Sequence, residues 1–289
     1  MSEHEQGTNR RPASPALGFG ARLAAAMADL GPLCVGVDPH PGLLQAWGLD
    51  DSAAGLREFS SRVLEAATGR AAAIKPQVAL YERHGSAGMA VLEGLLADAA
   101  SAGVLTIADA KRGDIGSTMA AYADAWLSPS SPLAADAVTL SPYLGFESLR
   151  PALDLAAAHG RGVFVLALTS NPEGASVQHV GGDVSVARRI VEAAAAENAG
   201  DPVLGSVGLV VGATVGSALE DLGIDLAALN GPVLAPGLGA QGATGSDLKV
   251  TFGAAYPQVL GTSSRDILKA GPSVEALVEA IGRTLDGLR

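Results

Sequence analysis

Eight short apolar segments, separated by stretches with the period of an α-helix, constrain the fold of this chain more than any other feature. The segments cover residues 33–38, 72–77, 104–110, 136–142, 163–170, 208–214, 232–237 and 258–264. Their apolar residues are continuous rather than alternating, which is typical of parallel strands buried on both faces. Ala- and Leu-rich stretches of helical period lie between some of them, at residues 56–69, 89–103, 185–200 and 273–288. This alternation indicates β-α units joined by right-handed crossovers.

Eight such units in a chain of 289 residues predict a single closed (β/α)8 TIM barrel of the α/β class. An open doubly wound sheet is the alternative, but such sheets usually have fewer strands and a Gly-rich turn after the first one. Here the first segment ends in Asp38 and is followed by Pro-His-Pro. We expect residues 17–289 to form one barrel domain. Residues 1–16 are expected to form a flexible tail, since they are polar and lack the apolar core of a secretion signal.

The net charge and the cysteine content limit which partners the protein can bind and which cellular compartment it is expected to occupy. A net charge of -11 argues against nucleic acid and against a membrane surface, because no basic stripe could neutralise many phosphates. Cys34 is the single cysteine, so no internal disulfide framework can form, and a reducing cytoplasm is expected. No apolar run reaches the roughly 18 residues of a membrane span. The five histidines lack the spacing of zinc ligands, so no metal site is predicted.

Polar or charged residues end nearly every apolar segment. The carboxyl ends of the strands form the active-site face of such a barrel, so these side chains should converge on one mouth. They are Asp38, Lys75, Asp109 with Lys111, Ser141, Thr169 with Ser170, Thr214, and Ser263 with Ser264 and Arg265.

The segment that ends in Asp109 and Lys111 carries the strongest chemical signal. Residues two apart in an extended strand point to the same side, so both side chains should face the barrel mouth. Buried ions cost several kcal/mol unless they are paired, which makes a purely structural role improbable here. Asp114 offers a second carboxylate, and carboxylates on both sides favour the protonated form of the Lys111 ammonium. We therefore expect Lys111 to donate a proton, and Lys75 to complete an alternating Lys-Asp-Lys-Asp array.

A phosphate site is predicted from the last two apolar segments. The Gly-rich loop after residue 234 exposes backbone amides and includes Gln241, while Arg265 stands at the start of a predicted short helix. Barrels commonly bind phosphate with the loops after strands seven and eight. We expect the loop after the seventh strand to act as a lid over the bound molecule.

An ordered set of motifs resembles the orotidine 5'-phosphate decarboxylase family in its longer bacterial form. The resemblance covers about residues 19–287, and its order matters because Asp-X-Lys-X-X-Asp alone occurs in related sugar-phosphate barrels. Arg112-Gly113 and Gly116-Ser117 stand where the shorter form of the family has an aromatic or apolar residue and Pro-Asn. The motifs are FGARL (19–23), CVGVDPH (34–40), AAIKPQ (72–77), ADAKRGDIGST (108–118), VTLSPYLG (138–145), TSNP (169–172), VVGAT (210–214), APGLGAQG (235–242) and SSRDIL (263–268).

The resemblance implies a decarboxylation that uses no cofactor. Orotidine 5'-phosphate would lose carbon dioxide from C6 and become uridine 5'-phosphate (UMP), in pyrimidine biosynthesis. Lys111 would protonate C6, Asp109 would lie against the departing carboxylate, and Lys75 would bind a ribose hydroxyl and orient Asp109. Asp114 and Thr118 would come from the partner subunit of a homodimer.

The same resemblance assigns the residues that would hold the substrate. Ser170 would read the pyrimidine edge and Asp38 would bind a ribose hydroxyl. Gln241 and Arg265 would bind the phosphate.

Three other functions stay open on the sequence alone. A related barrel could decarboxylate a keto-sugar phosphate, or make a hexulose phosphate, with a divalent metal beside the same Asp-Lys pair. A Schiff-base aldolase could use Lys75 or Lys111 as its nucleophile. A nucleotide-binding barrel could keep the fold and the phosphate site without turnover.

Overall fold

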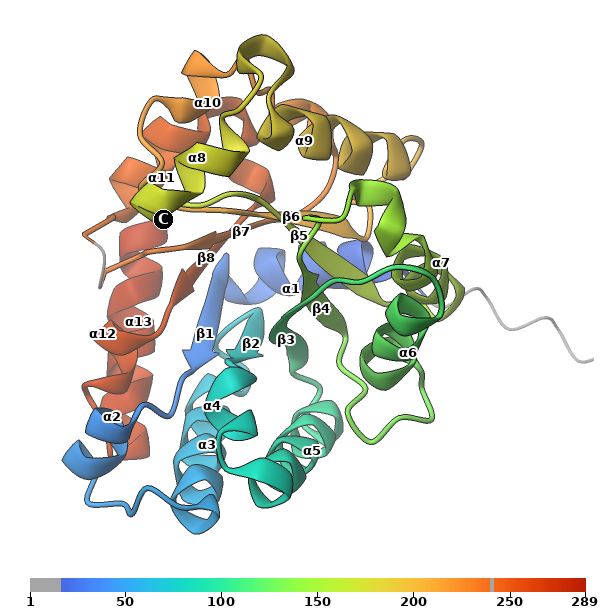
Figure 1. Ribbon diagram of the computed structural model, residues 1–289. Coiled ribbons are helices and arrows are strands. Elements are labelled where there is room, and N and C mark those ends of the chain that lie inside the picture. Colours follow the sequence, from blue (N-terminus) through green and yellow to red (C-terminus); the bar gives the residue numbers. More distant parts are fainter. Residues whose placement is uncertain (1–16, 240–241) are drawn as a thin grey trace, which may run out of the picture.

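Eight parallel strands close into a barrel in the order of the sequence, β1 to β8, with helices around the outside (Figure 1). The computed structural model describes residues 17–239 and 242–289. The predicted tail over residues 1–16 lies outside the described residues. The strands are β1 (Leu33–Val37), β2 (Ala73–Pro76), β3 (Leu105–Arg112), β4 (Ala137–Leu140), β5 (Gly162–Leu168), β6 (Val207–Val211), β7 (Val233–Pro236) and β8 (Val259–Ser263). Each predicted apolar segment contains or overlaps one strand, so the TIM-barrel prediction is confirmed.

The helices follow the strands as β-α units require. The four predicted helical stretches correspond to α3, α5, α9 and α13, with ends displaced by a few residues. No helix among the described residues is both long and apolar enough to cross a membrane. The helices are α1 (Phe19–Leu30), α2 (Pro41–Ala46), α3 (Ala53–Ala67), α4 (Ala79–Glu82), α5 (Gly85–Ser101), α6 (Gly116–Leu127), α7 (Arg150–Ala158), α8 (Ala175–Gln178), α9 (Val186–Glu197), α10 (Ala218–Asp221), α11 (Gly245–Phe252), α12 (Arg265–Leu268) and α13 (Val274–Leu288).

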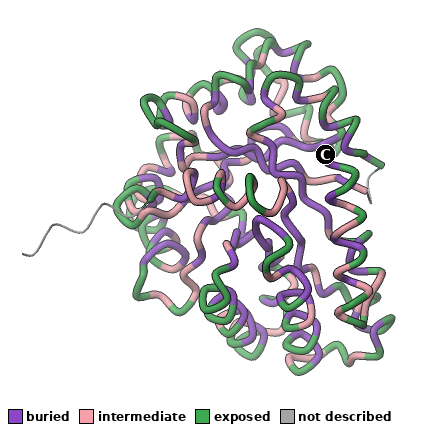
Figure 2. Tube along the Cα trace, turned by 180° about the vertical axis from the view of Figure 1, so that it is seen from behind, coloured by how far each residue is buried: buried purple, intermediate pink, exposed green. Residues whose placement is uncertain are grey.

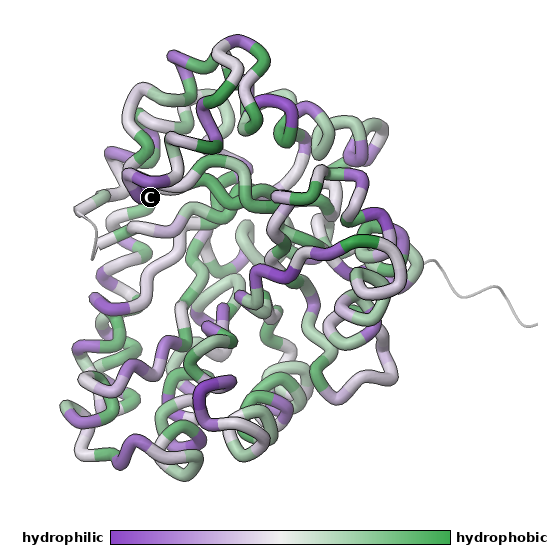
Figure 3. Tube along the Cα trace, in the orientation of Figure 1, coloured by the Kyte–Doolittle hydropathy of each residue, from purple (hydrophilic) through white to green (hydrophobic). Residues whose placement is uncertain are grey.

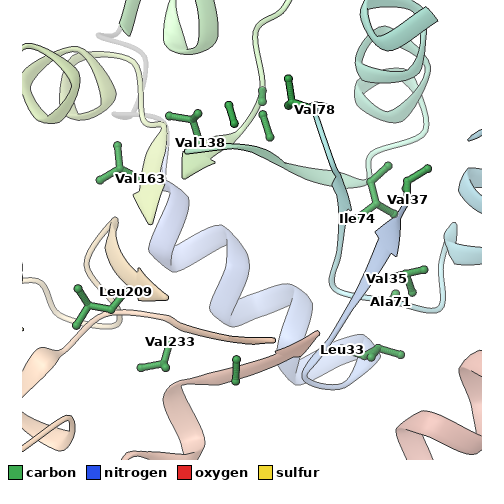
Figure 4. Close-up of a cluster of buried hydrophobic side chains, with 14 of the residues drawn as sticks. Leu33, Val35, Val37, Ala71, Ile74, Val78, Val138, Val163, Leu209 and Val233 are labelled. Atoms are coloured by element: carbon green, nitrogen blue, oxygen red, sulfur yellow. The ribbon is translucent and has the colours of Figure 1, made fainter. Parts of the chain in front are cut away.

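Both faces of the strands are buried, which explains their continuous apolarity. On β1, Leu33, Val35 and Val37 belong to the outer core between the strands and the helices, and Figure 4 shows these three side chains on one side of the strand. Cys34 belongs instead to a second cluster inside the barrel. Figure 2 shows the strands as the buried centre of the molecule, and Figure 3 shows hydrophobic residues concentrated along them.

Helix α1 closes the amino-terminal end of the barrel. Its Phe19 packs edge-on against Phe164 inside the barrel, with ring centroids 5.8 Å apart. Gly162 begins β5 directly beneath this ring, where an added Cβ would lie 2.2 Å from a ring carbon of Phe19. Arg22 of the same helix pairs with Asp136 at 2.7 Å, just before β4. Side chains of α1 thus fill this end of the barrel interior.

Candidate active site

A cavity of about 280 Å³ opens among the carboxyl ends of the strands. Five of the site residues predicted from the sequence line it: Asp38, Lys75, Asp109, Lys111 and Arg265. Its wall is completed by His40, Gln77, Leu166, Thr169, Val210, Leu234, Pro236, Gly237, Leu238, Thr262 and Ser264. Most of the predicted strand-end residues therefore converge on one mouth, as the barrel topology predicts. The ones that do not line this cavity are Ser141, Ser170, Thr214 and Ser263.

Two lysines bind the two oxygens of one carboxylate at the floor of this cavity. Lys75 Nζ lies 3.0 Å from Asp109 Oδ2, and Lys111 Nζ lies 2.5 Å from Asp109 Oδ1. The side chains of Lys75 and Asp109 are 6% and 9% exposed, whereas that of Lys111 is 46% exposed. Asp109 thus holds one ammonium inside the protein and directs the other toward the open part of the cavity.

Two residues that the sequence reasoning missed complete the coordination of Asp109. Gln77 Nε2 donates to Asp109 Oδ2 at 3.0 Å, and Thr139 Oγ1 donates to Oδ1 at 2.9 Å. Thr139 is fully buried in the apolar strand β4. The Thr139 hydroxyl within this apolar segment could have indicated a site residue. The sequence instead suggested Ser141, two residues later, as the polar end of the segment.

The charges of the pair stabilise each other against the cost of burial. Burial raises the pKa of the Asp109 carboxyl, but Lys75 and Lys111 outweigh burial and hold that pKa well below its usual 3.8. Burial likewise lowers the pKa of Lys75, but the carboxylates of Asp109 and Asp38 outweigh it and hold that pKa above its usual 10.5. Both groups are therefore charged at neutral pH.

The backbone at Lys111 departs from a regular strand. Lys111 has a φ of 49°, in the left-handed region that side chains other than glycine rarely adopt. The pairing of β3 with β4 is interrupted between Ala108 and Arg112. The Lys111 N–H donates to Thr139 Oγ1 at 2.9 Å instead of to a strand carbonyl. Asp109 and Lys111 do meet, but the expectation of two side chains on a regular strand was wrong in detail, because a local irregularity brings them together.

Asp114 and Thr118 lie outside the cavity of their own chain. Asp114 Oδ1 accepts a hydrogen bond from the N–H of Ile115 at 2.7 Å, and Thr118 is exposed in the first turn of α6. No ion pair within 4 Å joins Asp114 to a described cationic side chain. One chain therefore brings together three members of the predicted four-charge array, Lys75, Asp109 and Lys111. The placement of Asp114 in a neighbouring site stays a prediction.

Ser170 lies beside the main cavity rather than in its wall. It lines a neighbouring pocket of about 160 Å³ that shares Thr169 with the main cavity. Gln178 of α8 fixes Thr169 from two sides, accepting from its N–H and donating to its Oγ1, both at 2.8 Å. The Thr169 hydroxyl in turn donates to Asn171 Oδ1 at 2.6 Å. This network, which the sequence reasoning did not predict, positions the segment that carries Ser170.

The predicted phosphate loops meet at one side of the cavity. Arg265 begins the short helix α12 directly after β8, as expected, and it is exposed. Gly239 has a φ of 75° and packs on Asp266, where an added Cβ would lie 1.9 Å from a carboxylate oxygen, so this position requires glycine. Gln241 lies outside the described residues. The loop after β7 ends where α11 begins, and Thr244 and Asp247 form a capping box at this helix end.

The described residues contain no group of three or more His, Cys, Asp or Glu side chains that could hold a metal ion. Lysine ammonium groups lie within 3.0 Å of both oxygens of Asp109. The carboxylate at the floor of the cavity is therefore arranged to hold ammonium groups.

Known proteins resemble this chain over nearly its full length. A family model described as "Orotidine 5'-phosphate decarboxylase / HUMPS family" matches residues 31–280. An orotidine 5'-phosphate decarboxylase from Salinispora arenicola is 58% identical over 273 residues, which are 94% of this chain and 97% of that protein. One from Streptomyces coelicolor is 56% identical over 268 residues, 92% of this chain and 95% of that protein.

Solved structures agree with these relatives. A crystal structure from Streptomyces avermitilis, of a candidate orotidine 5'-phosphate decarboxylase, has a TM-score of 0.91 and 53% identity, covering 100% of this chain and 98% of that one. The Leishmania donovani OMP decarboxylase has a TM-score of 0.73 and 31% identity, covering 93% and 100%. On these matches, together with the barrel and its Lys-Asp-Lys floor, the chain belongs to the orotidine 5'-phosphate decarboxylase family.

Proposed function

We propose that this protein is a carboxy-lyase that converts orotidine 5'-phosphate to UMP and carbon dioxide, the last step of UMP biosynthesis. The observation that carries the proposal is the half-exposed ammonium of Lys111, held 2.5 Å from buried Asp109 at the floor of the cavity. The high identity to decarboxylases of this name supports the choice of substrate. The catalytic domain comprises residues 17–289, and the single buried Cys34 is compatible with a reducing cytoplasm.

The reaction needs a fixed cation that stabilises the negative charge formed on C6. When the bond between C6 and the carboxylate breaks, carbon dioxide leaves and the electron pair stays on C6. The Lys111 ammonium stabilises this charge and then gives C6 its proton, and solvent returns a proton to Lys111. Because Asp109 and Thr139 fix Lys111 before substrate binds, little reorganisation is needed during the reaction.

Contacts far from the reacting bond hold the substrate. Arg265 and Gln241 bind the phosphate, Asp38 and Lys75 bind the ribose hydroxyls, and Ser170 reads the pyrimidine edge. The environment of Asp38 supports ribose binding. Its buried Oδ1 has no hydrogen-bond partner among the described residues and can therefore accept a hydrogen bond from a hydroxyl. Binding energy from the phosphate can then close the loop after β7 over the site.

The active form is a homodimer in which Asp114 and Thr118 complete the site of the neighbouring subunit. Large apolar side chains are exposed close to Asp114, namely Ile115 at 62%, Tyr143 at 80% and Leu144 at 54%. The loops that carry them lie together, since the Ser141 N–H donates to the Arg112 carbonyl at 2.7 Å. An exposed apolar group of this kind beside an incomplete site favours association with a second copy.

The purified protein should consume orotidine 5'-phosphate in a spectrophotometric assay, at the same rate with and without a metal chelator. Loss of activity on chelation, or consumption of a keto-sugar phosphate in place of the nucleotide, would instead support a metal-dependent relative. Trapping of a substrate adduct by borohydride would support a Schiff-base aldolase. Binding of UMP without any turnover would indicate a nucleotide-binding barrel.

Mixing two inactive variants should restore activity if the site is shared. Lys111→Ala and Asp114→Ala proteins are each expected to be inactive, but a hybrid dimer places intact Lys111 and intact Asp114 in one of its two sites. After subunit exchange, verified by native mass spectrometry, activity should approach about a quarter of the wild-type rate, since hybrids make up half of the dimers. No recovery after verified exchange would contradict the shared site.

A further inference from the structure

The left-handed backbone of Lys111 is unusual for its residue type and requires restraint by its surroundings. A positive φ is unfavourable for lysine, and such conformations persist only where the surroundings impose them. Regular pairing of β3 with β4 is interrupted on both sides of Lys111, between Ala108 and Arg112. Strand pairing therefore resumes at Arg112, the residue directly after the strained one.

The Arg112 side chain contacts three parts of the structure around Lys111. Its Nη1 donates to the carbonyl of Ala110 at 3.2 Å, so the side chain reaches back across Lys111. Its Nη2 pairs with Glu82 at the end of α4. Its guanidinium lies over the rings of Tyr122 and Trp126 of α6, 5.7 and 5.9 Å from their centroids.

These contacts suit arginine and no other residue. A planar guanidinium can donate in two directions and stack on aromatic faces, whereas a lysine ammonium is a single point charge. The side chain is 24% exposed, so its interactions are partly shielded from water. Arg112 does not line the cavity.

We propose that Arg112 is a positioning residue for decarboxylation, which holds Lys111 in the left-handed conformation that aims its ammonium at Asp109 and the substrate. This inference rests on the proposed function of Lys111. Arg112 closes the irregular turn from outside the barrel, while Thr139 and Asp109 hold Lys111 from inside. The contacts of α4 and α6 with Arg112 are thereby coupled to the placement of the proton donor.

The test compares Arg112→Ala with a matched arginine far from the site. Arg62 also pairs with one carboxylate, Glu58, and one backbone carbonyl, Pro272, and its side chain is 31% exposed. We expect Arg112→Ala to lower kcat by roughly 10²-fold, since a displacement of about 1 Å can cost this much. Its affinity for UMP should stay unchanged, and added guanidinium should restore part of kcat. Arg62→Ala should keep both kcat and UMP affinity.

Two further measurements make the outcome decisive. Arg112→Lys keeps the charge but loses the fork and the stacking, so it should remain well below wild type. If Arg112→Ala fails to fold, Glu82→Gln weakens the ion pair between Arg112 and Glu82. This variant should also lower kcat without changing UMP affinity. Equal effects of Arg112→Ala and Arg62→Ala, or a loss of UMP affinity that matches the loss of kcat, would overturn the positioning role.

The proposal can fail separately from the proposed function. Absence of orotidine 5'-phosphate turnover in the wild-type protein would refute the proposed function, and with it a role of Arg112 in decarboxylation, but not the positioning of Lys111 by Arg112. The side-chain ammonium resonance of Lys111 in protein labelled with ¹⁵N-lysine, assigned through Lys111→Arg, reports the positioning directly. Arg112→Ala should shift this resonance, and an unchanged resonance would refute the role of Arg112.

Discussion

Lys111→Ala should lower kcat for orotidine 5'-phosphate by at least roughly 10⁴-fold. The substitution removes both the proton donor and the cation that stabilises charge on C6, and each role alone is worth about two orders of magnitude or more. UMP binding, measured by calorimetry, should remain, because the phosphate and ribose contacts are untouched. The fold should remain as well, since Asp109 keeps its bonds to Lys75, Gln77 and Thr139.

The matched control for this experiment is Lys249→Ala. Lys249 lies in α11 and donates to the main-chain oxygen of Arg289 at 2.7 Å, so its loss removes a lysine contact outside the cavity lining. It should leave kcat unchanged. Near-normal turnover by Lys111→Ala would show that the proton comes from another group.

Asp109→Asn should lower the free energy of unfolding by about 3–5 kcal/mol, because it leaves the buried ammonium of Lys75 without its carboxylate. Turnover should also be lost, since Lys111 loses the group that aims it. Urea unfolding of the wild-type and variant proteins measures the difference. A change of less than about 1 kcal/mol would mean that Lys75 is neutralised in another way.

A second substitution separates stability from catalysis. Adding Lys75→Met to Asp109→Asn removes the unpaired charge, and much of the lost stability should return, because apolar replacements of buried ion pairs are often neutral or stabilising. Activity should not return. Equal stability of the single and double variants would contradict the assignment of the penalty to Lys75.

The pH dependence of unfolding provides an independent check of the same pair. The lowered pKa of Asp109 adds stability above its usual 3.8, and this stability is lost as the pH falls below that value. The raised pKa of Lys75 adds stability below its usual 10.5, and this is lost as the pH rises above it. In Asp109→Asn, burial is opposed mainly by the carboxylate of Asp38 and should lower the pKa of Lys75. The stability deficit of this variant should therefore narrow between neutral pH and pH 10.

The barrel could be predicted from the sequence because its strands are covered on both faces. Burial on two sides requires continuous apolar segments, and each of the eight segments contains or overlaps a strand. The charged strand ends were informative for the same reason: Lys75 and Asp109 stand out in apolar surroundings, and barrel topology predicts where they converge. Local sequence thus identified the strands and most of the charged residues of the site.

The remaining geometry depends on how strands distant in sequence are placed against each other. Thr139 and Gln77 reach Asp109 only through the pairing of β3 with β4 and β2, and no local pattern encodes that distance. The left-handed backbone of Lys111 likewise contradicts the preference of its residue type. It is imposed by contacts from β4, α4 and α6 that exist only in the closed barrel. The sequence alone therefore specified the strand order and the reactive groups, whereas tertiary packing set the direction of the lysine that would donate the proton.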